Sequence, residues 1–434
     1  MNLLYANDVA GAYPPSWYAA STPALAPFAP LQGTIQADVC VVGAGYTGLS
    51  AALHLAEAGR RVVVLDAHRV GFGASGRNGG QLGSGQRVEQ DTLERMAGRE
   101  TAQALWSLAE DAKALVKGLI ETHGIECHLR PGIAHTGSSR AEVADLHAYV
   151  DLLQSRYGYG DVSALDAEAC RRICPSPDYC GGLLDMGAAH LNPLAFALGL
   201  ARAARDAGVQ IHERSHVQAI EQGSTVEVRT ADGVVHADHL ILACNGYLGG
   251  LAPQVSARVM PINNFIVATE PLGDAASRVL TRDIAVADSR FVVNYFRLSH
   301  DGRLLFGGGE SYGYRFPRDI AAKVRKPMSV IFPHLADVRI DYAWGGTLGI
   351  TMKRFPYLAR LGPNVLSASG YSGHGVGTAT HAGKLMALAI AGESDGFATM
   401  RRIPTPAFPG RGALRTPLLV LAMSWYALRD RLRF

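Results

Sequence analysis

The stretch Asp38-Val39-Cys40-Val41-Val42-Gly43-Ala44-Gly45-Tyr46-Thr47-Gly48 decides the fold of this chain. Its apolar, largely β-branched start predicts a short buried strand, because the strands of a parallel sheet are covered on both faces. The three glycines follow that strand in the spacing GxGxxG and open a helix predicted over 46–58. A second apolar strand is predicted over 61–65 and ends at Asp66. Strand, helix and strand within about 30 residues indicate the βαβ unit of a Rossmann-like domain.

The residue types in this unit suit a bound dinucleotide. Gly43 permits the tight turn, Gly45 lets the backbone approach a pyrophosphate, and Gly48 lets helix and strand pack closely. The unpaired N–H groups at the start of the helix favour phosphate oxygens. Asp66 is placed to bond the ribose hydroxyls of an adenosine, and its charge would repel a 2′-phosphate. By itself the unit fits NAD as well as FAD.

A second glycine cluster favours FAD. Gly370-Tyr371-Ser372-Gly373-His374-Gly375-Val376-Gly377 follows a strand predicted over 365–368 and precedes a helix predicted from about Thr378. A second helix start would stabilise the negative charge that an isoalloxazine gains around N1–C2=O on reduction. A third stretch, residues 71–81, is rich in small residues and suits a loop lying along an extended cofactor. On its chemistry alone, a flexible surface loop explains that stretch nearly as well.

The composition excludes several classes of protein. With 48% apolar and 18% charged residues, the 434-residue chain can bury a sizeable core, which excludes a disordered protein. A net charge of +3 is too balanced for an electrostatically driven nucleic-acid binder. Six cysteines are too few for a disulfide framework. Cys170, Cys174 and Cys180 lack the spacing of metal ligands, so we expect no metal site.

The recurrence of dinucleotide-type patterns at the start, middle and end of the chain predicts a discontinuous domain. From about 260 to 351 the predicted strands are longer, alternating and rich in Tyr, Phe and Arg, which is typical of a separate antiparallel sheet. The predicted fold class is α/β and α+β: a discontinuous Rossmann-like FAD-binding domain with an inserted antiparallel-sheet substrate domain. We assign residues 31–90, 160–258 and 345–392 to the FAD-binding domain, 91–159 and 259–344 to the substrate-binding domain, 1–30 to an N-terminal arm, and 393–434 to a C-terminal extension.

The glycine-rich stretches also carry a family resemblance. Residues 38–66, the loop 71–81 and the cluster 370–376 resemble the D-amino-acid-oxidase or glycine-oxidase superfamily of FAD-dependent amine oxidoreductases. More closely, the chain resembles the bacterial gamma-glutamylputrescine oxidoreductases, with matching pieces over nearly its whole length. These pieces are residues 16–21, 73–82, 247–249, 295–298, 307–309, 370–376 and 426–432.

The resemblance implies a cofactor and a reaction. FAD is expected to be non-covalent, because residues 344–356 hold no cysteine and Gly76-Arg77-Asn78 stands where relatives carry a histidine. The neutral amine would give a hydride from its α-carbon to flavin N5, and water would hydrolyse the resulting imine. The substrate stays open between gamma-glutamylputrescine or a related polyamine derivative and a secondary amino acid such as L-pipecolate, L-proline or sarcosine. The implied cofactor-binding residues are Gly43, Gly45, Tyr46, Thr47, Gly48, Asp66, Ala74, Ser75, Arg77, Asn78, Gly79, Gly80, Gln81, Val217, Gly246, Gly370, Ser372, Gly373, His374, Gly375 and Val376.

Five residues are candidates for the catalytic site, since hydride transfer needs alignment and a dry site more than a strong base. Tyr295 and Trp344 would form aromatic walls, with core packing as the equal alternative. Arg297 would pair with a substrate carboxylate, and the alternative is an ion pair elsewhere. His374 would neighbour the flavin or the substrate, with helix capping as the alternative. Gln81 joins them from the loop 71–81.

The expected partners are a small-molecule amine and an electron acceptor, either O2 or a respiratory acceptor. The strand predicted at 303–306 lacks the lysine that some relatives use for oxygen activation, so the acceptor stays open. The apolar stretch 417–428 is too short to span a bilayer. Flanked by arginines, it either docks on the domain or makes a peripheral membrane contact. The N-terminus lacks the basic region of a secretory signal, so we expect a cytoplasmic protein, with membrane association through this tail as the alternative.

Overall fold

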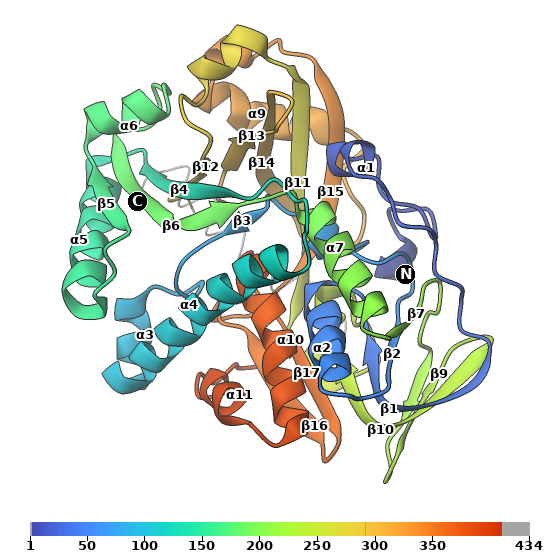
Figure 1. Ribbon diagram of the computed structural model, residues 1–434. Helices are drawn as coiled ribbons and strands as arrows, with labels where there is room; N and C mark the ends of the chain where they lie inside the picture. Colours follow the sequence, from blue (N-terminus) through green and yellow to red (C-terminus); the bar gives the residue numbers. More distant parts are fainter. Residues whose placement is uncertain (1, 291, 410–434) are drawn as a thin grey trace.

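The computed structural model describes residues 2–290 and 292–409, which form two large sheets with covering helices (Figure 1). The predicted membrane contact of the C-terminal tail and the matching piece 426–432 lie outside the described residues. Within the described part of the chain, no helix is long and apolar enough to cross a bilayer.

The first sheet has the glycine-motif strand at its centre. Among the described residues it has eight strands in the order β16-β17-β10-β1-β2-β7, with β9 and β8 continuing from β10. β1 pairs in parallel with both β10 and β2, and antiparallel pairing is confined to the β16–β17, β9–β10 and β8–β9 pairs. The strands are β1 (Gly33–Val42), β2 (Val62–Leu65), β7 (Gln210–His212), β8 (Ala219–Glu221), β9 (Val226–Arg229), β10 (Gly233–Leu242), β16 (Tyr357–Gly362) and β17 (Val365–Ser369).

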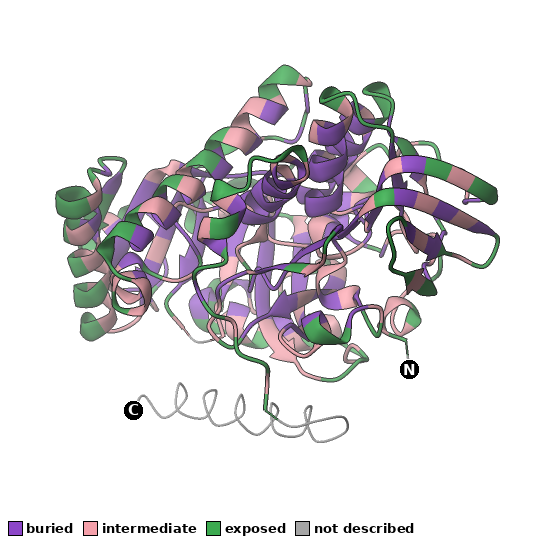
Figure 2. Cartoon of the chain, turned by 90° about the horizontal axis from the view of Figure 1, so that it is seen from below, coloured by how far each residue is buried: buried purple, intermediate pink, exposed green. Residues whose placement is uncertain are grey.

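Helices rich in alanine and leucine cover this sheet. α2 starts at Tyr46 within the glycine motif and α10 at Gly375 within the second glycine cluster, and the two helices pack on each other (Figure 1). Figure 2 shows buried residues concentrated in these central helices and strands. The helices of this part are α2 (Tyr46–Glu57), α3 (Gln90–Ala97), α4 (Arg99–Thr122), α7 (Pro193–Asp206), α8 (Pro253–Ser256), α10 (Gly375–Ala391) and α11 (Asp395–Met400), with single 3-10 turns η2 (Ala74–Gly76) and η3 (Asn245–Tyr247).

The second sheet is mostly antiparallel and carries its own core of Phe, Val and Leu. Its described strands follow the order β15-β11-β14-β13-β12-β4-β6-β3, and β5 pairs with β6. They are β3 (Gln81–Leu82), β4 (Arg130–Gly137), β5 (Val162–Leu165), β6 (Gly181–His190), β11 (Met260–Pro271), β12 (Ala285–Asp288), β13 (Tyr295–Leu298), β14 (Arg303–Ser311) and β15 (Ile340–Ile350). The adjoining elements are α5 (Arg140–Tyr157), α6 (Ala167–Ile173), η4 (Gly273–Arg278), α9 (Ile320–Ile331) and η5 (Pro333–Leu335).

The predicted fold class is confirmed, and the two sheets place some segments differently from the prediction. β5 and β6 were predicted in the FAD-binding domain, but β6 pairs with β4 and β5 pairs with β6, so both belong to the second sheet. β15 runs unbroken across the predicted border between residues 344 and 345. α4 packs on α10 and so lies with the first sheet, although residues 91–159 were predicted in the other domain. We therefore propose a domain division by sheet membership, in which residues 130–190 and 260–350 form the substrate-binding domain.

The chain before β1 is an extended arm with two short helical turns, η1 (Leu3–Tyr5) and α1 (Trp17–Ser21). In Figure 1 this dark blue segment passes from α1, beside β15, down to the start of β1. The arm therefore runs along both sheets.

Candidate active site

A cavity of about 1640 Å³ is lined by residues from both sheets. It is larger than the roughly 300–1,000 Å³ that suits one drug-sized ligand, so it has room for a dinucleotide together with a substrate. Most of the predicted cofactor residues line it: Gly43, Gly45, Tyr46, Thr47, Asp66, Ala74, Ser75, Arg77, Asn78, Gly79, Gln81, Val217, Gly246, Ser372, Gly373, His374, Gly375 and Val376. Gly48, Gly80 and Gly370 are not among its lining residues and act behind the cavity wall.

The glycine motif is shaped by close backbone contacts. Gly43 has φ +106°, and a Cβ there would lie 2.8 Å from the carbonyl oxygen of Ala243, just after β10. A Cβ on Gly48 would lie 1.8 Å from the carbonyl oxygen of Gly43. Side chains are excluded at both positions, because the first would strain the turn and the second would push α2 off β1.

Asp66 lies on the cavity wall at the end of β2, held by backbone donors. Its Oδ2 accepts from the N–H of Ala44 at 2.7 Å and its Oδ1 from the N–H of His68 at 2.8 Å. Burial raises the pKa of this carboxyl to about 6, against the lowering effect of the two N–H groups. Each carboxylate oxygen can accept a further bond, so hydroxyl donors from a ribose would complete the site.

The loop 71–81 is an ordered part of the site. The N–H of Tyr46, the first residue of α2, donates to Ser75 Oγ at 3.0 Å, which ties the loop to the start of the helix. Asn78 holds the loop together, since its amide donates to the carbonyls of Ala74 and Ser75, both at 3.0 Å. The predicted role of the loop as a cavity wall fits this geometry better than a flexible surface loop.

The two glycine clusters meet in space. Thr47 Oγ1 and the hydroxyl of Tyr371 share a hydrogen bond of 2.7 Å, although 324 positions separate them in the chain. The turn before α10 is further fixed because the N–H of Gly370 donates to Asn245 Oδ1 at 2.9 Å. The helix starts of α2 and α10 therefore face one cavity, as the FAD prediction requires.

Among the predicted catalytic residues, Tyr295, Gln81 and His374 line the cavity. The ring of Tyr295 fills the space in front of two glycines, since a Cβ would lie 2.7 Å from it at Gly79 and 2.1 Å at Gly307. Its hydroxyl donates to Asn264 Oδ1 at 2.6 Å, which fixes the ring. Gln81 Nε2 donates to the carbonyl of Val286 at 2.9 Å, which leaves Oε1 as an acceptor.

His374 sits at the start of α10 without capping the helix by its side chain. Its Nε2 lies 3.0 Å from the carbonyl oxygen of Gly85, so Nε2 carries the hydrogen and Nδ1 is left as an acceptor. Burial, with the nearby Arg87 charge, lowers the pKa of His374 to about 4. The imidazole is therefore neutral at pH 7.

The structure gives Arg297 a different role from the predicted one. The residue is only 4% exposed and is not among the cavity-lining residues. Its Nε donates to the carbonyl of Gly79 at 3.1 Å, and its Nη2 to the carbonyl of Leu191 at 3.0 Å. The guanidinium thus holds the loop 71–81 against the second sheet through hydrogen bonds to backbone carbonyls. In this geometry the prediction that Arg297 binds a substrate carboxylate is wrong.

Trp344 is likewise part of the core and lies outside the cavity lining. It is 2% exposed, and its Nε1 donates to the carbonyl of Arg77 at 3.0 Å. Its ring packs edge-on against Tyr18 of the arm. The core alternative left open for Trp344 therefore holds, and the predicted substrate wall does not.

Comparison with known proteins identifies the family. The family described as DAO, FAD dependent oxidoreductase, matches residues 38–389. The chain belongs to this DAO family. It is 45% identical to the probable oxidoreductase OrdL of Rhizobium meliloti, over 96% of this chain and 97% of that one. It is 42% identical to the gamma-glutamylputrescine oxidoreductase of Escherichia coli K12, over 96% and 98% of the two chains.

Solved DAO-type structures share the fold. Glycine oxidase from Geobacillus kaustophilus superposes with a TM-score of 0.70 at 22% identity, covering 83% of this chain and 95% of that one. L-proline dehydrogenase from P. horikoshii superposes with a TM-score of 0.68 at 18% identity, covering 83% and 94%. The DAO-family assignment makes this protein an FAD-dependent oxidoreductase, which confirms the predicted cofactor and enzyme class.

The described residues fit FAD. The two helix starts bonded through Thr47 and Tyr371 supply two sets of backbone donors to one cavity. Asp66 supplies acceptors on its wall, and most residues of the loop 71–81 line it as well. Non-covalent attachment stays a prediction, as do the individual roles of the cofactor residues.

Several charged residues of this DAO-family site escaped sequence analysis. The cavity is also lined by Arg87, Glu89, His135, Asp185, Asp288, Arg290, Glu310 and Arg354. Burial, followed by the neighbouring Arg354 charge, lowers the pKa of Arg87, and burial raises that of Glu310. They occur singly or two positions apart in loops and strands, a spacing that matches no known motif. Only the long-range packing of both sheets brings them together.

Within the described residues, no group of three His, Cys, Asp or Glu side chains could hold a metal ion.

Proposed function

We propose that this enzyme oxidises a C–N bond of an amine that carries a carboxylate at its other end. Gamma-glutamylputrescine is the leading candidate, and the alternative is a secondary amino acid such as L-pipecolate, L-proline or sarcosine. The near full-length similarity to a gamma-glutamylputrescine oxidoreductase supports the first candidate. The electron acceptor, O2 or a respiratory acceptor, belongs to the same proposal.

The guanidinium group of Arg87 is the observation that supports this proposal best. Its side chain is exposed to the cavity it lines, and its Nε donates to the carbonyl of Ser372 at 3.3 Å. Within the described chain, neither of its terminal nitrogens has a hydrogen-bond partner, whereas the cavity-lining Arg77 and Arg290 are each paired with aspartates. A guanidinium with two free nitrogens matches the geometry of a carboxylate. Arg87 therefore takes the role that sequence analysis gave to Arg297.

Other groups that line the cavity suit the ammonium group and the reacting amine of such a substrate. Glu310, whose Oε2 accepts from the hydroxyl of Tyr312 at 3.0 Å, would attract a substrate ammonium group. The neutral His374 offers Nδ1 as an acceptor for an amine N–H, and the Tyr295 ring excludes water from the reacting carbon. When bound, FAD supplies the hydride acceptor that the oxidation needs.

Anaerobic bleaching of the flavin absorbance tests the proposal. The panel is gamma-glutamylputrescine, putrescine, spermidine, L-pipecolate, L-proline, sarcosine and D-alanine. We expect the fastest bleaching with an amine that carries a carboxylate, and reoxidation on admitting air would identify O2 as the acceptor. Faster bleaching by putrescine or spermidine than by every carboxylate-bearing amine would contradict the proposal.

Variants of Arg87 sharpen the test. Loss of a charge-assisted hydrogen bond of about 1.5–3 kcal/mol should weaken binding of the carboxylate-bearing substrate roughly 10- to 150-fold in Arg87→Gln. Arg87→Lys keeps the charge and should recover part of that loss. Putrescine, which has no carboxylate, is the internal control: an equal loss for putrescine would rule out the assigned role.

A further inference from the structure

We propose that residues 2–16 of the arm form the outer wall of the FAD site and slow the release of the cofactor. The proposal concerns the cofactor and holds for any substrate, although it rests on FAD binding in the cavity described above. The matched family region begins at residue 38, so this wall lies ahead of the part shared across the DAO family.

The first turn of the arm lies at the Asp66 end of the cavity. Asn2, Leu3 and Leu4 line the same cavity as Asp66. The carbonyl of Leu4 accepts from His68 Nε2 at 2.8 Å, and His68 in turn supplies the backbone N–H that Asp66 accepts. This turn therefore closes the cavity where the nucleoside half of FAD is predicted to bind.

The rings around this turn continue the wall. Tyr5 lies 5.1 Å from the ring of His68 and 5.7 Å from that of His216, which also lines the cavity. None of the three residues of η1 is buried, and the half-buried Leu3 and Leu4 both line the cavity. A molecule bound in the cavity would cover more of these two leucines, which would stabilise the closed arm.

A buried ion pair fastens the next part of the arm. Asp8 Oδ1 lies 3.0 Å from Arg77 Nη1, and the two side chains are only 8% and 1% exposed. Arg77 belongs to the loop 71–81, and its guanidinium stacks on Phe72 at 4.3 Å. Phe72 stacks on His68 at 3.7 Å, with the planes 3° apart. Asp8 thus connects the arm to the stacked side chains of Arg77, Phe72 and His68. His68 is also the residue that donates to the carbonyl of Leu4.

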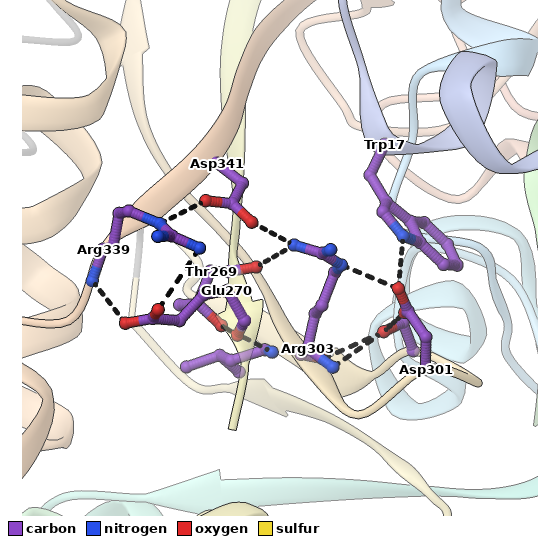
Figure 3. A network of polar contacts seen from close by, with 9 residues as sticks. Trp17, Thr269, Glu270, Asp301, Arg303, Arg339 and Asp341 are labelled. Atoms are coloured by element: carbon purple, nitrogen blue, oxygen red, sulfur yellow. Dashed lines mark hydrogen bonds and ion pairs between the residues drawn. The ribbon is translucent and has the colours of Figure 1, made fainter. Parts of the chain in front are cut away.

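The arm also forms hydrogen bonds with loops that adjoin strands of the second sheet. The amide of Asn7 donates to the carbonyl of Tyr314 at 2.7 Å, and Asn7 Oδ1 accepts from the N–H of Phe316 at 2.7 Å. Figure 3 shows Trp17 Nε1 donating to Asp301, which is itself paired with Arg303. The first two anchors lie in the loop after β14 of the second sheet, the Asp301 anchor lies in the turn between β13 and β14, and the Leu4 contact is with His68, just after β2 of the first sheet. The arm therefore connects loops that belong to the two sheets. FAD release then requires contacts at one end of the arm to break.

The test measures FAD release from the holoenzyme, followed as the rise of flavin fluorescence after dilution. Two variants loosen the arm: Asp8→Ala, and the double variant Leu3→Ser with Leu4→Ser. We expect both to release FAD about tenfold faster or more. Asp8→Ala leaves the buried Arg77 without its carboxylate, and the two serines make the wall polar, so each variant weakens the contacts that hold the arm over the cavity. Release at the wild-type rate in both variants would overturn the proposal.

A matched pair of variants separates the arm from general loosening of the fold. Asp301→Ala and Asp341→Ala each remove an ion pair of Arg303, but only Asp301 also accepts from Trp17 of the arm. We expect Asp301→Ala to speed FAD release more than Asp341→Ala does, and equal effects would count against the arm.

Hydrogen exchange gives a readout that does not depend on turnover. FAD should protect the amides of residues 2–12 in the wild type. Loss of that protection in the double leucine variant, with apoprotein stability unchanged, supports the proposal. Protection that is the same with and without FAD contradicts it.

Discussion

Replacing Arg297 with methionine distinguishes its observed role from substrate binding. The guanidinium donates to the carbonyls of Gly79 and Leu191 at 3.1 and 3.0 Å, and its Nη2 lies 3.4 Å from the Tyr18 hydroxyl. Each charge-assisted bond contributes about 1.5–3 kcal/mol to stability. Removing the buried charge also removes its desolvation cost, which offsets part of the lost stability. We expect Arg297→Met to lose about 2–4 kcal/mol of stability.

Thermal unfolding of the holoenzyme measures this loss. At roughly 2 °C per kcal/mol for a large domain, Tm should fall by about 4–8 °C. Arg339→Met is the control, since Arg339 contacts two carboxylates but its side chain is 67% exposed, and the Tm of this variant should change little. Because Gly79 supports the Tyr295 ring, kcat should fall for all substrates alike, with no selective rise in KM for those with a carboxylate.

A second readout comes from His190. Burial, and then the Arg297 charge, lower the pKa of His190 to about 4. Removing that charge should raise the pKa of His190, which NMR of the histidine ring would detect. A wild-type Tm together with a tenfold or larger KM increase confined to carboxylate-bearing substrates would refute this reasoning and restore the original prediction.

Further predictions concern the glycine motif, α4 and pH. Gly48→Ala should prevent FAD retention, because its Cβ would lie 1.8 Å from the Gly43 carbonyl; the flavin absorbance of the purified protein measures this. Gly118→Ala, where a Cβ in α4 would meet nothing within 4 Å, should instead raise stability by about 0.5–1 kcal/mol in thermal unfolding. Burial lowers the pKa of His381 to about 4, so between pH 6.5 and 4 the unfolded chain binds a proton that the folded chain does not. The free energy of unfolding should therefore fall as the pH drops through this window, and His381→Gln should reduce this decline by up to about 3 kcal/mol, measured by denaturant unfolding at each pH.

The sequence was most informative where function depends on local spacing. Gly43, Gly48 and Asp66 could be predicted because strand, turn, helix and strand are consecutive, and their roles depend on backbone geometry within one unit. The fold class followed from the same logic applied to the second glycine cluster. The details of sheet membership did not, because β6 joins the second sheet through pairing with β4, and β5 joins it through β6.

The candidate site was predicted less well on its substrate side. Tyr295 and Arg297 share one face of β13, so alternation gave no reason to separate them. The backbone at Gly79 and Leu191 fills the space beside Arg297, and this obstruction comes from two distant segments. Arg87 was missed because a single arginine in a loop carries no periodic signal, and only the assembled cavity shows that its terminal nitrogens have no partner among residues 2–290 and 292–409.

The hydrogen bond between Thr47 and Tyr371 also has a consequence for biosynthesis. The two helix starts that it joins are 324 positions apart, so a growing chain cannot complete the cofactor site until its second glycine cluster has left the ribosome. A chain truncated before that cluster would lack the backbone donors at the start of α10. Flavin content therefore distinguishes chains that contain both glycine clusters from shorter ones, and flavin-free chains should be the first substrates of quality-control proteases.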